Sequence, residues 1–425
     1  MSPSSSEAWL REGGWARLGE VVGAAHLRPA TPADAVAGVL PRAVIEPGSA
    51  AELSAVLRHA HELGLRLAPR GGGSKMEWGN PPRGLDAIVS TRRLERVVDH
   101  AWADMTATVE AGCTVAGFQR TLAEHGQRLS LDPLWPDRAT IGGVLATNDS
   151  GALRVRFGAM RDLVVGITVA LADGTLARSG GKVVKNVAGY DLPKLMAGSL
   201  GTLAVITEAT FRLYPLPRRV RSLSFVLPTA EAVSRVVLAV LDSTLVPTGL
   251  QIRAQKGGSL VVDIRLEGEE AALDARVEEL RGLVAIKGEE APAEVWEARE
   301  ALWAGAEPAV VCRLAVLPTR LGTLCERVGR EAERGGLSWR MVSQAGGLAW
   351  LRLEGSTALL EVLRSLRRGV EAEEGSLALL HCPPEARAGA EAWGAPGDSL
   401  PLMHRVKEQF DPAALLNPGR FVGGI

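Results

Sequence analysis

The chain has 425 residues, of which 46% are hydrophobic and 23% charged, and its formal net charge is −1. This length predicts two or three domains with a sizeable core, and the lack of a basic run argues against a nucleic-acid partner. The four cysteines are widely spaced without a CxxC, which excludes a cysteine-built zinc or iron–sulfur site of the usual spacing. No stretch reads as a signal peptide or approaches the roughly 18 apolar residues of a membrane helix, so we expect a cytoplasmic protein without a membrane span.

The first half of the chain predicts strands and helices in alternation. Residues 1–40 are polar and rich in Pro and Ala, which is typical of an irregular or helical lead-in. From residue 41 the pattern indicates a strand, a helix that Ser49 can cap, and a second strand that leads into three glycines. Further elements are expected as strands at 85–91 and 106–112, a helix at 114–126 ended by Gly126, a hairpin around Asp173-Gly174, and a strand or strand pair at 203–217. We therefore expect a first domain over 41–217.

The second half changes character near residue 220. Runs with strand-like composition alternate with helices rich in Ala, Glu and Arg up to residue 390. The helices are expected at 230–242, 270–282, 320–335 and 357–367. Three or four strands between them predict an α/β cap domain over 218–390, a sandwich built on an antiparallel sheet. The tail, 391–425, is expected to form a short helix and turns that pack back on the first domain, which makes the fold class α+β.

A glycine-rich loop, PRGGGSKMEWG, follows the second predicted strand. It lacks the spacing of a P-loop, and it does not lead into a helix as the glycines of a Rossmann motif do. Consecutive glycines between a strand and a loop can turn successive N–H groups toward an anion. A tight turn that binds no ligand would explain the same residues, so this loop alone leaves both interpretations open.

Two further windows combine small residues with hydroxyl and amide groups. The first, DPLWPDRATIGGVLATNDSG, covers residues 132–151, and its glycines allow backbone to pass close to a flat or charged ligand. The second, residues 180–212, contains one of the two tyrosines, Tyr190, and a GSLGTL turn that opens a strand. Three such windows in one domain favour a ligand site over a set of unrelated turns.

Together these stretches resemble a known family. PRGGGS, TIGG, TNDSG, NVAGYDLPKLMAGSLGTLAVITE and the terminal FDPAALLNPGR are similar to the vanillyl-alcohol-oxidase (PCMH-type) FAD-binding superfamily. Within it, GGGSKMEWG and GGKVVKNVAGYDLPKLMAGSLGT most resemble the FAD-binding accessory subunits of bacterial glycolate oxidases. The resemblance covers roughly 41–217 and 405–421 and is weak over 220–390. It implies a PCMH-type FAD-binding domain of two subdomains, followed by the cap domain.

The resemblance also implies that FAD lies extended between the two subdomains. The amides from Gly71 to Lys75 would hold the pyrophosphate, residues 140–143 would pass along the dinucleotide, and Tyr190 and Asp191 would lie toward the isoalloxazine ring. A diphosphate suits convergent amides, and the ring suits an apolar slot. The residues expected at the FAD site are Arg70, Gly71, Gly72, Gly73, Ser74, Lys75, Gly79, Pro133, Thr140, Ile141, Gly142, Gly143, Thr147, Ser150, Gly151, Lys185, Tyr190, Val205, Ile206 and Asn417.

Two departures from the family pattern concern the chemistry. Many members attach the flavin covalently through a His just after these glycines, and this chain has Ser74 there, so we expect FAD to be bound non-covalently. The catalytic 2-hydroxy acid dehydrogenases of the family carry a His-Gly-Asp-Gly-Asn-type run and further histidines that act as base and sometimes bind metal. This chain has no such run, so we assign no catalytic residue and no metal site.

The individual histidines and lysines allow more than one interpretation. His59, His61 and His125 fall in predicted surface helices, where a solvated side chain is the simplest interpretation. His381 stands at a predicted strand end in the second domain, from which it could face a substrate. Lys185 could face the pyrimidine edge of the flavin, whereas a solvated helix position explains Lys194.

Three functions remain open at this point. The first is an FAD-binding subunit of a glycolate (2-hydroxy acid) oxidase complex, beside a catalytic FAD subunit and an iron–sulfur subunit. The second is a self-sufficient FAD-dependent 2-hydroxy acid or alcohol oxidase whose substrate groups come from 220–390. The third is a flavin-free structural module. The resemblance favours the first, with a small 2-hydroxy acid as the substrate class, and it leaves room for a peripheral position at the inner membrane face through the partners.

Overall fold

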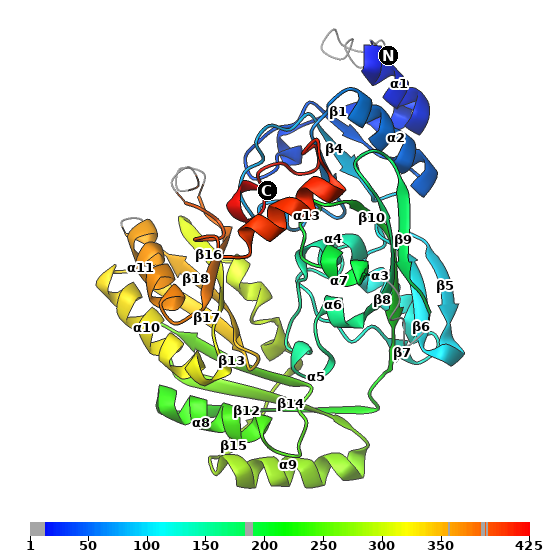
Figure 1. Cartoon of the computed structure of the whole chain (residues 1–425). Coiled ribbons are helices and arrows are strands. Elements are labelled where there is room, and N and C mark those ends of the chain that lie inside the picture. The colour runs from blue at the N-terminus through cyan, green and yellow to red at the C-terminus, as the bar shows by residue number, and fades with distance from the viewer. Residues whose placement is uncertain (1–12, 183–189, 356–357, 384–386, 388–389) are drawn as a thin grey trace. The chain divides into compact units, whose positions relative to one another are not determined.

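The computed structural model describes residues 13–182, 190–355, 358–383, 387 and 390–425 (Figure 1). By packing, the chain divides into two units. Unit 1 contains the chain up to Asp149, Ala159–Pro215 and Ala395–Ile425, and unit 2 contains Ser150–Gly158 and Leu216–Gly394. The boundaries predicted at residues 217 and 390 lie close to two of these division points. The excursion of Ser150–Gly158 into unit 2 has no counterpart in the predicted division.

The first sheet of unit 1 has four strands in the order β1 (Leu27–Pro29), β2 (Ala43–Ile45), β4 (Ala87–Ser90) and β3 (Leu67–Arg70). β2, β4 and β3 are parallel, and β1 is antiparallel to β2. Helices α1 (Gly13–Val22) and α2 (Ala50–Glu62) pack with this sheet into one apolar core. The predicted cap of α2 is confirmed, because Ser49 Oγ accepts a hydrogen bond from the Glu52 amide at 3.1 Å.

The second sheet of unit 1 has five antiparallel strands. Their order is β5 (Val97–Ala101), β6 (Thr106–Glu110), β10 (Val205–Arg212), β8 (Val164–Ala170) and β9 (Leu176–Gly180). The predicted hairpin is confirmed: β8 and β9 pair around Asp173-Gly174, where Gly174 has a φ of +84°. The accompanying helices are α3 (Val115–Ala123), α4 (Ile141–Thr147), α6 (Met160–Leu163) and α7 (Leu192–Met196), and β7 (Gln127–Arg128) pairs with β11 (Tyr214–Pro215).

Unit 2 is one eight-stranded antiparallel sheet with helices packed on one face. The strand order is β15 (Gly288–Glu290), β12 (Arg219–Leu227), β14 (Leu260–Gly268), β13 (Gly249–Gln255), β17 (Ser338–Gln344), β18 (Leu348–Glu354), β16 (Ala309–Ala315) and β19 (Ser376–His381). The helices are α8 (Ala230–Leu241), α9 (Glu270–Val284), α10 (Leu321–Arg334) and α11 (Leu359–Glu371), and the short α5 (Arg154–Phe157) also belongs to this unit. The antiparallel sheet is as predicted, but the expected three or four strands were too few.

The C-terminal segment returns to unit 1. Helix α13 (Leu400–Phe410) is followed by an extended stretch in which Leu416 pairs in parallel with Leu67 of β3. β3 is the edge strand of the four-stranded sheet, so this stretch covers its free edge. Among the described residues, no helix has the length and apolar character needed to cross a membrane.

Candidate functional site

Strand β3 delivers the chain into the glycine loop, residues 71–78. The loop ends in a turn in which the Trp78 amide donates to the Lys75 carbonyl at 3.1 Å. Within the part of the chain that the structure describes, the amides of Gly71, Gly72, Gly73 and Ser74 donate no hydrogen bond. Successive unpartnered amides at the end of a strand form a concave site for an anion. These four donors make the loop a candidate anion site.

The glycines also serve a packing role that the sequence did not indicate. A Cβ on Gly71 would lie 1.9 Å from the Thr140 Oγ1, and a Cβ on Gly72 would lie 1.6 Å from the Arg138 carbonyl oxygen. Gly73 has a φ of +73°, in the left-handed region that side chains disfavour. The missing Cβ atoms therefore allow the loop to pack against residues 138–140, a segment far away in the sequence.

Helix α4 forms the opposite wall. Thr140 caps its N-terminus, where its Oγ1 accepts a hydrogen bond from the Gly143 amide at 3.3 Å. At the other end, Thr147 Oγ1 donates back to the Gly143 carbonyl at 2.9 Å. Gly142 has no room for a side chain because its Cβ would lie 2.8 Å from the Ala111 Cβ. The small residues of α4 thus let the helix pack closely on Ala111, while its other side faces the glycine loop.

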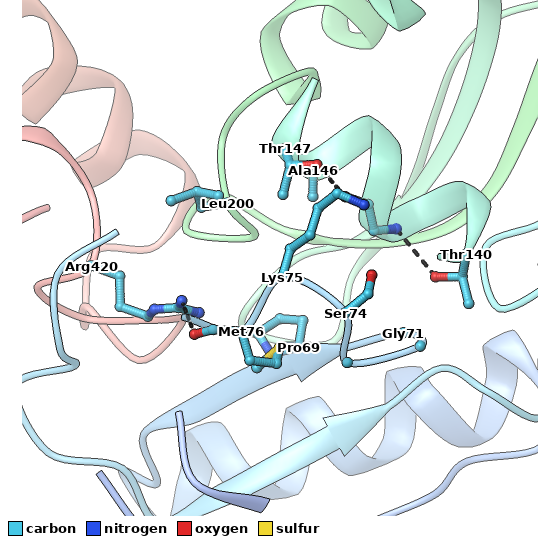
Figure 2. A pocket seen from close by; sticks show the side chains of 13 residues that line it. Pro69, Gly71, Ser74, Lys75, Met76, Thr140, Ala146, Thr147, Leu200 and Arg420 are labelled. Atoms are coloured by element: carbon cyan, nitrogen blue, oxygen red, sulfur yellow. Dashed lines mark hydrogen bonds between the residues drawn. The ribbon is translucent and has the colours of Figure 1, made fainter. Parts of the chain in front are cut away.

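A cavity lies between the glycine loop and α4 (Figure 2). It has two contiguous parts, of about 60 and about 50 Å³, which share five lining residues. From the predicted site, its lining includes Arg70, Gly71, Gly72, Gly73, Ser74, Lys75, Thr140, Gly142, Gly143, Thr147, Val205 and Ile206. Residues that the sequence placed in three separate windows are thus brought together around one space.

The cation of the loop is already neutralised by protein groups. Lys75 is 8% exposed, and its Nζ lies 3.4 Å from the Asp149 Oδ2 and donates to the Leu134 carbonyl at 3.2 Å. The ammonium also lies 5.7 Å from the ring centre of Trp78 and 5.4 Å from that of Trp135. Because its charge is paired inside unit 1, Lys75 serves to fix the loop on its neighbours, and any part it has in anion binding falls to its backbone.

A second ion-pair network fixes Arg70, the residue that precedes the glycine loop. Arg70, at the end of β3, donates to the Asp34 Oδ1 at 2.7 Å, and Arg28 forms two hydrogen bonds with the same carboxylate at 2.8 and 2.9 Å. The hydrogen bond from Arg28 is the main reason that the pKa of Asp34 lies well below its usual range, and Thr31 and Arg70 add to this effect. The Arg70 guanidinium is therefore held in place by a buried carboxylate.

The remaining predicted site residues do not line the cavity, namely Gly79, Pro133, Ile141, Ser150, Gly151, Tyr190 and Asn417. Ser150 and Gly151 belong to unit 2, where the Ser150 carbonyl accepts a hydrogen bond from Arg299 at 3.0 Å. Tyr190 is 91% exposed. Asp191 caps α7 and forms an exposed ion pair with Lys194 at 2.6 Å. Lys185 lies outside the described residues.

The cavity also has lining residues that the sequence did not assign. They are Pro69, Met76, Thr91, Ala146, Leu200, Gly201, Ala204 and Arg420. Leu200 and Gly201 belong to the GSLGTL turn, and Arg420 ends the NPGR stretch, so the motifs that contain them were recognised. Which residue of each motif faces the cavity depends on how the loops pack, and that information is not in the local pattern.

The cavity has no side chain suited to take a proton. Among the described residues its lining contains no His, Asp, Glu, Tyr or Cys. No cluster of three or more His, Cys, Asp or Glu that could hold a metal occurs in the part of the chain that the structure describes.

The prediction that His59 is solvated is wrong: it is 8% exposed, and its Nε2 lies 3.0 Å from the Gly14 carbonyl oxygen, because α2 packs this side of the helix against α1.

Two family models match the chain. Residues 41–180 match the FAD binding domain, and residues 394–421 match the C-terminal domain of FAD linked oxidases. The first contains the glycine loop and α4, and the second contains Arg420. These matches confirm FAD as the cofactor, and the cavity with its unpartnered amides fits the diphosphate of such a group.

Curated relatives include dehydrogenases and oxidase subunits. D-lactate dehydrogenase of Archaeoglobus fulgidus is 28% identical over 90% of this chain and 93% of its own length. Glycolate oxidase subunit GlcE of Escherichia coli is 29% identical over 83% of this chain and 92% of its own length. Glycolate oxidase subunit GlcD of Bacillus subtilis is 32% identical, but the match covers 51% of this chain and 46% of that subunit.

Solved structures share the fold over almost the whole chain. An alkyldihydroxyacetonephosphate synthase matches with a TM-score of 0.74 and 18% identity, covering 95% of this chain and 84% of that one. p-Cresol methylhydroxylase matches with a TM-score of 0.74 and 14% identity, covering 98% of this chain and 97% of that one. The predicted fold class, a PCMH-type FAD-binding domain with a cap domain on an antiparallel sheet, is confirmed.

Proposed function

We propose that this FAD-dependent oxidoreductase is the FAD-binding subunit of a glycolate, or related 2-hydroxy acid, oxidase complex. In this proposal it works beside a related catalytic FAD subunit and an iron–sulfur subunit. Its flavin passes electrons within the assembly, or the chain serves to complete the assembly. The catalytic FAD subunit carries out the oxidation of the substrate.

The proposed FAD site is the cavity between the glycine loop and α4. The amides of Gly71–Ser74 would hold the diphosphate, Thr140 and Gly143 would lie along the dinucleotide, and Val205 and Ile206 would cover the adenine. No acidic side chain lines this space among the described residues, so a diphosphate meets no like charge there. When bound, FAD supplies the ring that accepts a hydride or electrons.

The observation that carries the accessory role is the match to subunit GlcE over most of both proteins, because the cavity lining concerns only the diphosphate and adenine end of the proposed site. Oxidation of a 2-hydroxy acid requires a base positioned to take the hydroxyl proton as the hydride leaves. The described lining has hydroxyl groups, amides and apolar side chains but no imidazole, carboxylate or phenol. This composition suits the diphosphate and the adenine of FAD, and a base for the substrate would have to lie near the isoalloxazine ring, outside this lining.

The lengths over which the relatives match this chain also support the proposal. The match to subunit GlcE covers most of both proteins, whereas the match to subunit GlcD stops at about half of each. Such a pattern, a match over most of the chain to one subunit and over about half of it to another, is what a flavin subunit beside a related flavin subunit would give.

A self-sufficient 2-hydroxy acid dehydrogenase is the second candidate. The D-lactate dehydrogenase relative favours it, because that match covers nine-tenths of each protein. The base would then come from unit 2, where His381 Nε2 lies 3.6 Å from the Glu307 Oε1.

Anaerobic reduction separates the two candidates. The chain purified alone is loaded with FAD and mixed with glycolate or D-lactate, and the flavin absorbance is followed. The proposal predicts that the flavin stays oxidised with the chain alone and is bleached after co-expression with its partner subunits. Bleaching by the chain alone, lost in His381→Gln, would establish the second candidate instead.

A further inference from the structure

The C-terminal tail, residues 407–420, contacts both loops that line the cavity. We propose that this tail is a positioning element for FAD: Lys407, Asn417 and Arg420 hold the two loops at the spacing that FAD requires, and so set the affinity of the chain for its flavin. The inference rests on the proposed location of FAD in the cavity between the glycine loop and α4.

The tail first fixes the strand from which the glycine loop starts. The Leu67 amide of β3 donates to the Leu415 carbonyl at 2.7 Å, and the Asn417 amide donates to the Leu67 carbonyl at 2.8 Å. Since β3 is the edge strand of its sheet, these hydrogen bonds add the tail as an outer neighbour. The first residue of β3, four residues before Gly71, is thus paired with the tail on the side away from β4.

Arg420 holds the far end of the glycine loop. Its Nη2 donates to the Met76 carbonyl at 2.7 Å and to the Trp78 carbonyl at 2.6 Å, and the residue is 3% exposed (Figure 2). Arg420 and Met76 both line the cavity. Hydrogen bonds from a charged donor are stronger than those between neutral groups, and here they fix two carbonyls of a loop without regular structure.

Lys407 and Asn417 hold the other loop, residues 198–204. Asn417 Nδ2 donates to the Leu200 carbonyl at 2.6 Å, and Lys407 Nζ donates to the Thr202 carbonyl at 2.6 Å. Asp411, which lies 2.6 Å from the same ammonium, balances the buried charge. Leu200 and Gly201 line the cavity, so the tail also contacts this part of the lining.

These contacts give the tail a role beyond stability. The two loops are at least 120 residues apart in the sequence, and one short segment donates hydrogen bonds to carbonyls of both. If the tail loses its hydrogen bonds to one loop, the amides of Gly71–Ser74 are still present, but their distance from Leu200 is no longer fixed. Affinity for FAD should then fall because ordering the loop is added to the cost of binding.

The test measures FAD affinity and loop order in full-length variants. Arg420→Met removes both hydrogen bonds while it keeps an apolar stem, and Arg420→Lys keeps the charge. Arg405→Met, at an exposed position of α13 two residues before the tail, removes a charge without touching either loop. We expect at least about tenfold weaker FAD binding for Arg420→Met, an intermediate loss for Arg420→Lys, and no change for Arg405→Met. Fluorescence titration of the FAD-free proteins, well below their unfolding temperatures, gives the affinities.

Hydrogen exchange supplies a readout that is independent of flavin. In FAD-free Arg420→Met, amides of residues 74–79 should exchange faster than in the wild type, and in Arg405→Met they should not. A fourth variant, Ala146→Phe, fills the cavity from α4. If Ala146→Phe binds FAD normally, the proposed location of the flavin is wrong. If it loses FAD while Arg420→Met keeps wild-type affinity, the location stands and the role of the tail is overturned.

Discussion

Ser74 has a hydroxyl group at the place where a covalent flavin link in related proteins uses a histidine nitrogen. The residue lines the cavity, so the difference lies at the proposed FAD site (Figure 2). A serine hydroxyl has no basic lone pair of this kind, and the lining offers no His, Tyr or Cys among the described residues to replace it. We predict that acid precipitation of the holoprotein releases all flavin into the supernatant, measured by its absorbance. Yellow colour that stays with the washed pellet would contradict this.

Asp34 is a residue whose charge should matter for stability. It is 4% exposed and accepts hydrogen bonds from Arg28 and Arg70, which keep its pKa in the folded protein below that of the unfolded chain. Such a carboxylate stabilises the fold above its unfolded pKa of about 4, and this contribution falls as the pH drops toward the folded value. Asp34→Asn should therefore lower the free energy of unfolding by about 2 kcal/mol at pH 7.

The measurement is chemical unfolding of both proteins from pH 7 to pH 3. The difference between wild type and Asp34→Asn should shrink below about pH 5, because the unfolded wild-type chain takes up a proton that the folded one does not. Asp398→Asn, at an exposed position, is the matched control and should leave the free energy unchanged. A difference that stays constant over this range would mean that the ion pairs with Arg28 and Arg70 contribute no net stability.

At the scale of elements, local signals predicted the regular structure well. Ser49 caps α2 as its position suggested, and Gly126 follows α3 with a φ of +66°. The number of strands in unit 2 was underestimated, although β13 and β17 carry Arg and Gln on one face in the alternation that is typical of a half-buried strand. Helix α4 was not predicted at all, since two glycines lie within its seven residues and packing on Ala111 holds it.

The packing of the glycine loop on residues 138–140 gives a prediction at this scale. Gly72→Ala would place a Cβ 1.6 Å from the Arg138 carbonyl oxygen, a backbone atom that cannot turn aside. We expect a loss of at least about 1–3 kcal/mol in the free energy of unfolding and weaker FAD binding, because the loop and α4 must separate. Gly181→Ala meets no atom within 4 Å and should change neither quantity. Denaturant unfolding and FAD titration of both variants check this, and a fully stable Gly72→Ala would contradict the packing.

At the scale of the whole molecule, the features that could not be predicted from the sequence are contacts between distant segments. The resemblance identified the FAD-binding windows, and most of their residues do surround one cavity. It could not show that Asp149 neutralises Lys75, that Ser150 and Gly151 leave unit 1, or that Arg420 reaches Met76. Each of these depends on which segments meet in three dimensions, and no local composition or spacing encodes that.

The location of the cavity within unit 1 leads to a prediction for the whole chain. If FAD occupies it, the four unpartnered amides from Gly71 to Ser74 gain acceptors, and their hydrogen exchange should slow by up to about 100-fold at an FAD concentration 100 times the dissociation constant. Residues 200–206 should be protected as well, since they line the same space. Amides in the centre of β12 and β14 of unit 2 already pair within their sheet and should not change. Protection that appears on unit 2 but not on the glycine loop would place the flavin elsewhere in the molecule.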